Sequence, residues 1–222
     1  PDGSLVRPDL FIPLAEETGL ITPITDQVLA NVVHDLGSLL AKHPTLYVAI
    51  NVAAEDMTSG RILDMVKMRV PGSGIRPDQI WLEATERGLL EESARQTITQ
   101  ARQAGYRIAI DDFGTGYSSL SLLQKFPIQR LKIDKSFVSG VAQDESARSL
   151  VRTIIAMGDS LGLDMVAEGI ESVQQLQILA EMKCAKAQGF LISHPVPPES
   201  MGSTIASLDS FGAWNKLRGK NS

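Results

Sequence analysis

Polar side chains end the short apolar runs of this sequence, and their types suit one chemistry. They are Asn51, Glu83, Asp111 with Asp112, Lys132 with Asp134, Glu168, and Gln188. Because the acids and amides offer only oxygen ligands, with no His or Cys tied to them, they favour Mg²⁺ or Mn²⁺ over zinc. The ammonium group of Lys132 suits the orientation of an attacking water or the neutralisation of a phosphoryl oxygen. These parts together indicate a hydrolase that acts on a phosphodiester, and they do not identify the diester.

These residues act together only if the chain brings the ends of the runs to one place. The β-rich runs are Leu46–Val52, Gln79–Ala84, Arg107–Asp111, Arg130–Asp134, Asp164–Glu168 and Ala185–Phe190. Stretches with helical spacing lie between them: Thr25–Leu40, Ile62–Val70, Ser93–Ala104, Ser119–Lys125, Ser146–Leu161 and Gln174–Met182. Alternating strands and helices predict an α/β fold around a parallel sheet. In such sheets and barrels the carboxyl ends of the strands form the active-site face.

Composition and length exclude several other classes of protein. The chain has 222 residues, 43% hydrophobic and 21% charged, which predicts one soluble domain, residues 1–211, followed by a tail, residues 212–222. No run of about 18 apolar residues is present, so we expect no membrane contact from this chain. The single cysteine, Cys184, excludes disulfide scaffolds. A net charge of −5 argues against binding DNA through a broad basic face.

The motifs around these residues resemble those of the EAL domain family, the cyclic di-GMP phosphodiesterases. The most diagnostic segment is Ile110-Asp-Asp-Phe-Gly-Thr-Gly-Tyr-Ser-Ser-Leu120. The other matching segments are Phe11-Ile-Pro-Leu-Ala-Glu-Glu17, Asn51, Leu82-Glu-Ala-Thr-Glu86, Leu131-Lys-Ile-Asp134, Val166-Ala-Glu-Gly-Ile-Glu171 and Ala187-Gln-Gly-Phe190. They follow one another in the family's order and spacing, as far as about Pro198.

The resemblance implies a TIM-like (β/α) barrel that hydrolyses cyclic di-GMP to linear 5′-pGpG with Mg²⁺ or Mn²⁺, and that Ca²⁺ inhibits. By this resemblance Asn51, Glu83 and Asp111 hold a first metal ion, and Asp111, Asp112 and Glu168 hold a second. Lys132 would position the attacking water, and Glu168 has also been cast as a general base.

The same resemblance assigns residues around the metal site. Glu86 would brace the loop Phe113–Ser119, which shapes a homodimer contact in this family. Glu171 and Gln188 would lie behind the metal ligands or against the substrate. Asp134 shares a strand face with Lys132, so we place it near a guanine or at the wall of the site.

One departure from the family pattern concerns the start of the chain. The Glu-Ala-Leu signature is absent, and the sequence begins at the family's next segment, Pro-Asp-Gly. We count six strands where a TIM-like barrel has eight, so the first N-terminal strands are expected to be missing from this chain. One of them would carry a glutamate ligand and a substrate-binding arginine.

Two functions within this family remain open at this point, beside a third, an unrelated α/β metal-dependent phosphoesterase, which rests on the strand-end residues alone. The first is the phosphodiesterase, in the cytoplasm, where cyclic di-GMP is found. The alternative is a non-catalytic EAL module that binds cyclic di-GMP or a protein partner as a receptor. Every ligand expected after the first motif is present, which favours the enzyme. EAL domains commonly follow sensor or GGDEF modules, so the resemblance allows such a module upstream in the parent protein.

Overall fold

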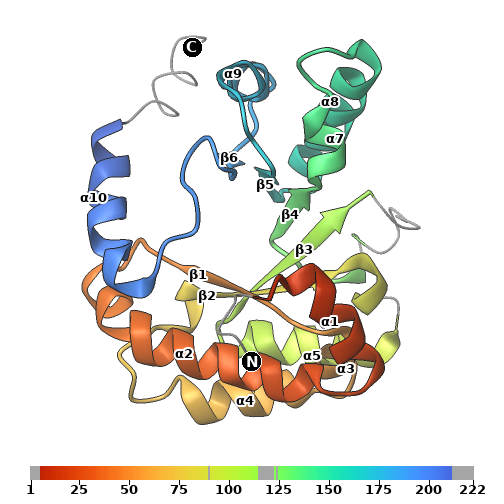
Figure 1. The fold of residues 1–222 in the computed structure, drawn as a ribbon. Helices are drawn as coiled ribbons and strands as arrows, with labels where there is room; N and C mark the ends of the chain where they lie inside the picture. Colours follow the sequence, from red (N-terminus) through yellow and green to blue (C-terminus); the bar gives the residue numbers. More distant parts are fainter. Residues whose placement is uncertain (1–5, 90, 115–122, 124, 212–222) are drawn as a thin grey trace. The chain divides into compact units, whose positions relative to one another are not determined.

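Parallel strands alternate with helices through most of the chain in this computed structural model (Figure 1). The structure describes residues 6–89, 91–114, 123 and 125–211. Most of the helix expected over Ser119–Lys125, and the expected tail, lie outside these residues. The chain divides into two compact units: residues 1–84 with 88–106, and residues 85–87 with 107–222. Within the described residues, no helix combines the length and the hydropathy needed to cross a bilayer.

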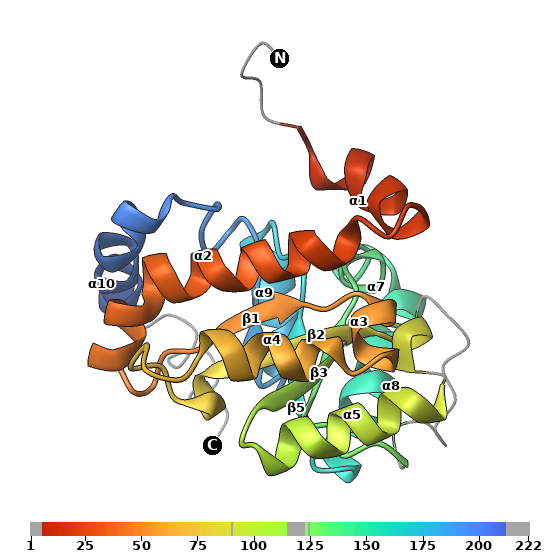
Figure 2. The ribbon, with the colours of Figure 1, turned by 90° about the horizontal axis from the view of Figure 1, so that it is seen from below.

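The first unit contains two parallel strands and most of the helices of the N-terminal half. Its elements are α1 (Pro8–Glu17), α2 (Ile21–Lys42), β1 (Val48–Asn51), α3 (Ala54–Thr58), α4 (Arg61–Arg69), a 3-10 turn (Pro77–Gln79), β2 (Ile80–Thr85, to Ala84 in this unit) and α5 (Glu92–Gln103). The strands pair in register from Val48 with Ile80 to Asn51 with Glu83. Helix α2 packs against β1 and α4, as Figure 2 shows.

The N-terminal helices extend beyond the sequence prediction. Helix α2 begins at Ile21, four residues before the expected Thr25, because Pro23 falls in the first turn, where a backbone N–H has no helical partner to lose. Helix α1 was not predicted as an element. Its Pro8 occupies the first helical position, where proline is favoured.

A buried glutamine joins three segments of the first unit. Gln79 is 2% exposed, and its Nε2 donates to the carbonyl oxygens of Leu40, His43 and Leu46 at 2.9–3.1 Å. Its Oε1 accepts from the backbone N–H of Arg76 at 3.1 Å. One side chain therefore provides hydrogen-bond donors for the backbone carbonyl groups at the end of α2 and before β1. It also fixes the start of β2 beside these segments.

The second unit holds the other four strands, which lie side by side in sequence order (Figure 1). Its elements are the 3-10 turn that begins at Glu86 (Glu86–Leu89), β3 (Arg107–Phe113), β4 (Arg130–Ile133), α7 (Lys135–Ser139), α8 (Glu145–Ser160), β5 (Asp164–Ala167), α9 (Val173–Glu181), β6 (Lys186–Ala187), a 3-10 turn (Pro198–Ser200) and α10 (Met201–Phe211). All six expected strands are therefore present in the chain. Helices α7 and α10 were not predicted. Helix α7 follows β4 at once because the carboxylate of Asp134 caps it, accepting from the N–H of Ser136 at 2.9 Å.

An ion-pair network spans three strands of the second unit. Arg130 on β4 is 3% exposed and donates two hydrogen bonds to Asp164 Oδ2 on β5, at 2.7 and 3.0 Å. Lys186 on β6 donates to the same oxygen. Burial would raise the pKa of Asp164, but the hydrogen bonds from Lys186 and Arg130 outweigh it and hold that pKa below its usual value.

Replacing Gln79 by leucine should destabilise the chain by about 2 kcal/mol or more, because buried carbonyl groups lose their donor. Urea unfolding followed by circular dichroism measures this change. Gln96→Leu, at an exposed position on α5, is the control and should change the unfolding free energy by less than about 0.5 kcal/mol. Equal losses in the two variants would contradict the role given to Gln79.

Asp164→Asn should reduce the loss of unfolding free energy that the wild-type chain shows as the pH falls. Because the folded pKa of Asp164 is lowered, its ionised form stabilises the chain above the unfolded pKa of about 3.9, and this contribution is lost as the pH falls through the folded pKa. Urea midpoints between pH 7 and about pH 3 measure the effect, with the exposed Asp159→Asn as control. Parallel acid profiles for wild type and Asp164→Asn would count against the network.

Candidate active site

Three carboxylates meet at the carboxyl ends of β3 and β5 in the second unit. Asp111, Asp112 and Glu168 each offer one oxygen, and these atoms lie within 4.8 Å of one another. Asp111 and Asp112 belong to β3, whereas Glu168 directly follows β5 and continues its ladder, with its N–H donating to Ile133 O at 3.1 Å. The carboxyl edge of the parallel sheet thus brings these side chains together, as the sequence predicts.

A bulge in β3 allows two consecutive aspartates to serve the same cluster. On a regular strand, successive side chains point to opposite faces. Here Ile110 pairs with Leu131 and Phe113 with Ile133, so the register shifts between them. Asp112 has a φ of 51°, in the left-handed region that aspartate tolerates better than most residues. The sequence pattern gives no sign of this bulge, although it decides where the second carboxylate lies.

Lys132 supplies the positive charge of the cluster from β4. Its side chain is 7% exposed, and its Nζ lies 3.0 Å from Asp111 Oδ1 and 2.6 Å from Glu168 Oε1. Arg130 and Lys132 alternate along β4, so their side chains share one face of the sheet, and Asp134 directly follows the strand as the N-cap of α7. The strand therefore aims a buried ammonium group between two carboxylates.

The charges around Asp112 are not fully balanced by Lys132. Burial, followed by the charges of Asp111 and Asp134, raises the pKa of Asp112, and Lys132 opposes this only in part. The pKa of Asp134 is shifted in the opposite direction. Burial would raise its pKa, but hydrogen bonds from Ser136 and Asp112 hold that pKa below its usual value. A proton thus stays on Asp112 more readily than on an ordinary aspartate.

This donor set fits a hard divalent cation. Oxygens from Asp111, Asp112 and Glu168 are the ligand type that Mg²⁺ and Mn²⁺ prefer. Burial, followed by repulsion from the carboxylates of Asp111 and Asp134, raises the pKa of Asp112, and a bound cation would relieve the repulsion. Among the described residues of the second unit, Asp111, Asp112 and Glu168 form the acidic group that could hold one.

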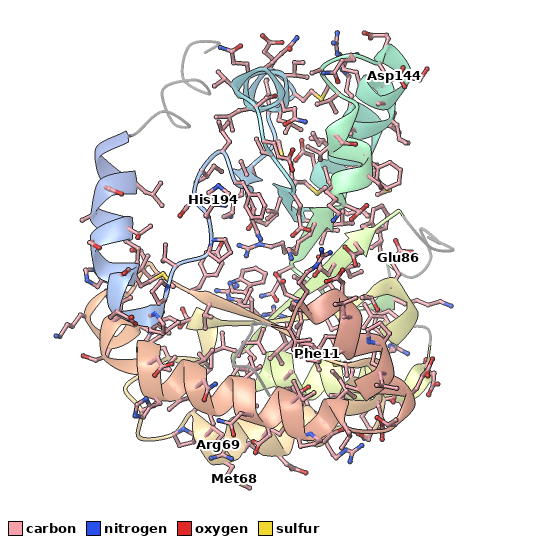
Figure 3. All side chains as sticks on the ribbon, in the orientation of Figure 1. Phe11, Met68, Arg69, Glu86, Asp144 and His194 are labelled. Atoms are coloured by element: carbon pink, nitrogen blue, oxygen red, sulfur yellow. The ribbon has the colours of Figure 1, made fainter. Side chains whose placement is uncertain are left out.

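Glu86 contacts the backbone just beyond the two aspartates (Figure 3). Its side chain is buried, and its Oε1 accepts from the N–H of Gly114 at 2.8 Å. Gly114 has a φ of +100°, and a Cβ there would lie 2.7 Å from the ring of Phe137. Only glycine fits this contact, so Glu86 and Phe137 together fix the turn after Asp112. Residues 115–119 of the expected loop Phe113–Ser119 lie outside the described part of the chain.

Asn51 and Glu83 lie in the first unit. They are register partners at the end of β1 and on β2, and the N–H of Val52 donates to Glu83 O at 2.8 Å. Glu83 is 6% exposed, whereas Asn51 is exposed. Because partner side chains on parallel strands share a face, the amide and the carboxylate point to the same side of two strands that are about 4.8 Å apart.

The last two predicted site residues follow β5 and β6. Glu171 is exposed, and its N–H donates to Gln175 Oε1 at 2.9 Å at the start of α9. Gln188 is also exposed, and its backbone extends the ladder by donating to Ala167 O at 2.8 Å. Ala167 directly precedes Glu168, so Gln188 borders the carboxylate cluster.

Relatives of this chain are signalling proteins and phosphodiesterases. The chain is 40% identical over 199 residues to the probable cyclic di-GMP phosphodiesterase PdeB of Escherichia coli. This alignment covers 89% of this chain and 38% of PdeB. It is 39% identical over 215 residues to the cyclic di-GMP phosphodiesterase NbdA of Pseudomonas aeruginosa, covering 95% of this chain and 26% of NbdA. The signalling protein YkoW of Bacillus subtilis is 39% identical, over 95% of this chain and 26% of YkoW. The chain thus spans between about a quarter and two fifths of these relatives.

Solved structures agree with these relatives. The PaMucR phosphodiesterase in its c-di-GMP complex matches with a TM-score of 0.85 and 35% identity, over 90% of this chain and 83% of that one. The parallel strands and alternating helices are those of the family's TIM-like barrel, with six of its strands among the described residues. The family model named EAL domain matches residues 1–195. The chain belongs to the EAL domain family.

Proposed function

We propose that this chain hydrolyses cyclic di-GMP to linear 5′-pGpG with Mg²⁺ or Mn²⁺. The observation that carries the proposal is the cluster in which Lys132 lies against Asp111 and Glu168, next to the strained Asp112. Membership of the EAL family, with relatives named as cyclic di-GMP phosphodiesterases, supports the choice of diester.

The cluster suits hydrolysis of a phosphodiester by water. Attack on phosphorus forms one P–O bond and breaks the bond to the ribose 3′ oxygen, which leaves with a proton. Glu168 is a carboxylate within reach of Lys132 and can accept the proton of the attacking water. Lys132 donates to the water or to the phosphoryl oxygens, where its charge offsets the negative charge that develops.

The metal ligands of this proposal follow the family resemblance. Asn51, Glu83 and Asp111 would hold one ion, and Asp111, Asp112 and Glu168 a second. When bound, Mg²⁺ or Mn²⁺ supplies an activated water and positive charge against the phosphate. Ca²⁺ is expected to occupy these ligands without supporting turnover.

The proposal includes the setting of the reaction. Residues 1–211 would form the catalytic domain, in line with the family match over residues 1–195. Glu171, Gln188 and Asp134 would contact the substrate or support the metal ligands. We also propose a cytoplasmic location, where the messenger is found, and a homodimer formed through the Phe113–Ser119 region.

Lys132→Ala should lower kcat for cyclic di-GMP by about 100-fold or more, because the ammonium group no longer offsets charge at the phosphate. Chromatography of 5′-pGpG in Mg²⁺ or Mn²⁺ measures the rate, with a Ca²⁺ sample beside it. The assay uses this chain and a form extended upstream by about thirty residues, enough for two strands and a turn.

Lys135→Ala, three residues along on α7, is a matched control that removes an exposed lysine and should leave kcat unchanged. If the extended form bound cyclic di-GMP but produced no 5′-pGpG, this result would contradict the enzyme proposal. It would favour a receptor module instead.

Glu86→Ala should lower kcat by about 10- to 100-fold, because the turn after Asp112 loses the carboxylate that holds Gly114. Since Glu86 positions this turn, the Mn²⁺ concentration for half-maximal activity should rise as well. Glu86→Gln keeps an acceptor oxygen and should restore most of both values. An unchanged Mn²⁺ dependence in Glu86→Ala would refute the positioning role.

A further inference from the structure

A lysine on β6 lies level with a point midway between two carboxylates of the neighbouring strand. Lys186 pairs in register with Val166 of β5. Asp164 stands two residues before Val166, and Glu168 stands two residues after it. Glu168 continues the ladder of β5, since its N–H donates to Ile133 O at 3.1 Å. Side chains two residues apart on a strand share a face, so Lys186 has one carboxylate on either side of it along β5.

In this structure the ammonium group of Lys186 contacts Asp164. It donates to Asp164 Oδ2, the oxygen that also accepts two hydrogen bonds from Arg130. Glu168 belongs to the carboxylate cluster, where the Nζ of Lys132 lies 2.6 Å from its Oε1. Lys132 and Lys186 therefore have separate partners, one within the cluster and one nearer the amino end of β5.

The side chain of Lys186 is the part of this arrangement that can move. It is 39% exposed and carries its charge on a flexible four-carbon stem, whereas Arg130 is buried and held by two hydrogen bonds. Because Lys186 is level with Val166, Asp164 and Glu168 begin at equal distances from it, each about 6.6 Å along the strand. The ammonium group that meets one carboxylate would thus reach the other after a change of rotamer.

We propose that Asp164 is a positioning residue that keeps the ammonium group of Lys186 away from Glu168. This inference rests on the proposed function, because it concerns the cation affinity of the same carboxylate cluster. Glu168 already has the ammonium group of Lys132 beside it. A second ammonium group at Glu168 would neutralise a carboxylate that a divalent cation needs, and its charge would repel that cation. With Asp164 as the partner of Lys186, Glu168 stays available as a ligand.

Stability of the fold does not explain the contact between Lys186 and Asp164. The buried guanidinium of Arg130 needs Asp164, because an unpaired buried charge is costly. Lys186 has no such need, since its side chain reaches solvent and ion pairs of partly exposed lysines contribute little to stability. The consequence of the Lys186 contact is therefore where it places a positive charge.

Asp164→Asn should raise the dissociation constant for Mn²⁺ by about tenfold, because Lys186 loses its ionised partner and turns to Glu168. Removing the lysine as well, in Asp164→Asn/Lys186→Met, should return this constant to within about twofold of the wild-type value. Lys186→Met alone should also stay within about twofold, since Asp164 already holds the lysine away. Electron paramagnetic resonance of free Mn²⁺, without substrate, measures the constants for this chain and its extended form.

Asp164→Asn/Lys183→Met is the matched control. Lys183 is an exposed lysine in the turn before β6, so this variant has the same net charge as the rescuing one. It should keep the weak Mn²⁺ binding of Asp164→Asn. Urea unfolding of every variant shows that each is folded in the binding assay. A loss of binding caused only by a weakened fold would not be reversed by removing Lys186.

The outcomes separate this inference from the proposed function. If the wild type cleaves cyclic di-GMP and Asp164→Asn binds Mn²⁺ as tightly as the wild type, the positioning role alone is overturned. It is also overturned if Lys186→Met fails to restore binding, or if Lys183→Met restores it equally well. If the wild-type chain and its extended form neither bind Mn²⁺ nor cleave cyclic di-GMP, the proposed function fails, and this inference fails with it.

Discussion

Carboxylates that meet at one edge of a sheet repel one another, and the second unit is organised around that repulsion. Asp111, Asp112 and Glu168 have oxygens within 4.8 Å of one another, a separation at which like charges repel. Lys132 relieves part of this cost through contacts at 3.0 Å with Asp111 and 2.6 Å with Glu168. The pKa of Asp112 stays raised nonetheless. Burial is the first cause of this rise and the charges of Asp111 and Asp134 add to it, so a bound divalent cation would offset the part that is due to charge.

Local backbone geometry makes this crowding possible. The bulge in β3 and the left-handed φ of Asp112 turn neighbouring aspartates towards one cluster, a conformation that costs free energy unless the surroundings enforce it. Enforcement comes from the next residues: Glu86 accepts from the N–H of Gly114, and the ring of Phe137 leaves no room for a side chain at that glycine. The turn after Asp112 thus maintains the geometry of the carboxylates, although it contributes no ligand.

Sequence alone predicts the strands and the polar residues at their ends, because apolar runs and their boundaries are local features. Glu168 and Lys132 meet as expected, since parallel strands place their carboxyl ends together. The bulge at Asp112 is not predictable in this way, because a double aspartate fits a regular strand equally well. Helix α1 was missed because its proline content masks helical periodicity. The contact of Lys186 with Asp164 depends on side-chain conformation, and no spacing in the sequence encodes it.

Two carboxylates on the same sheet show how charge distinguishes structure from function. Asp164 accepts hydrogen bonds from Arg130 and Lys186, and its pKa is lowered. The negative charge of Asp164 is therefore balanced by basic side chains of the protein. Asp112 has acidic neighbours, and its pKa is raised. An aspartate whose charge is balanced by the protein's own basic side chains stabilises the fold. An aspartate whose charge is not balanced in this way is suited to bind a cation. Arg130 and Lys132 alternate on one strand, so β4 serves both purposes: Arg130 pairs with the structural aspartate, and Lys132 reaches the cluster that needs an added cation.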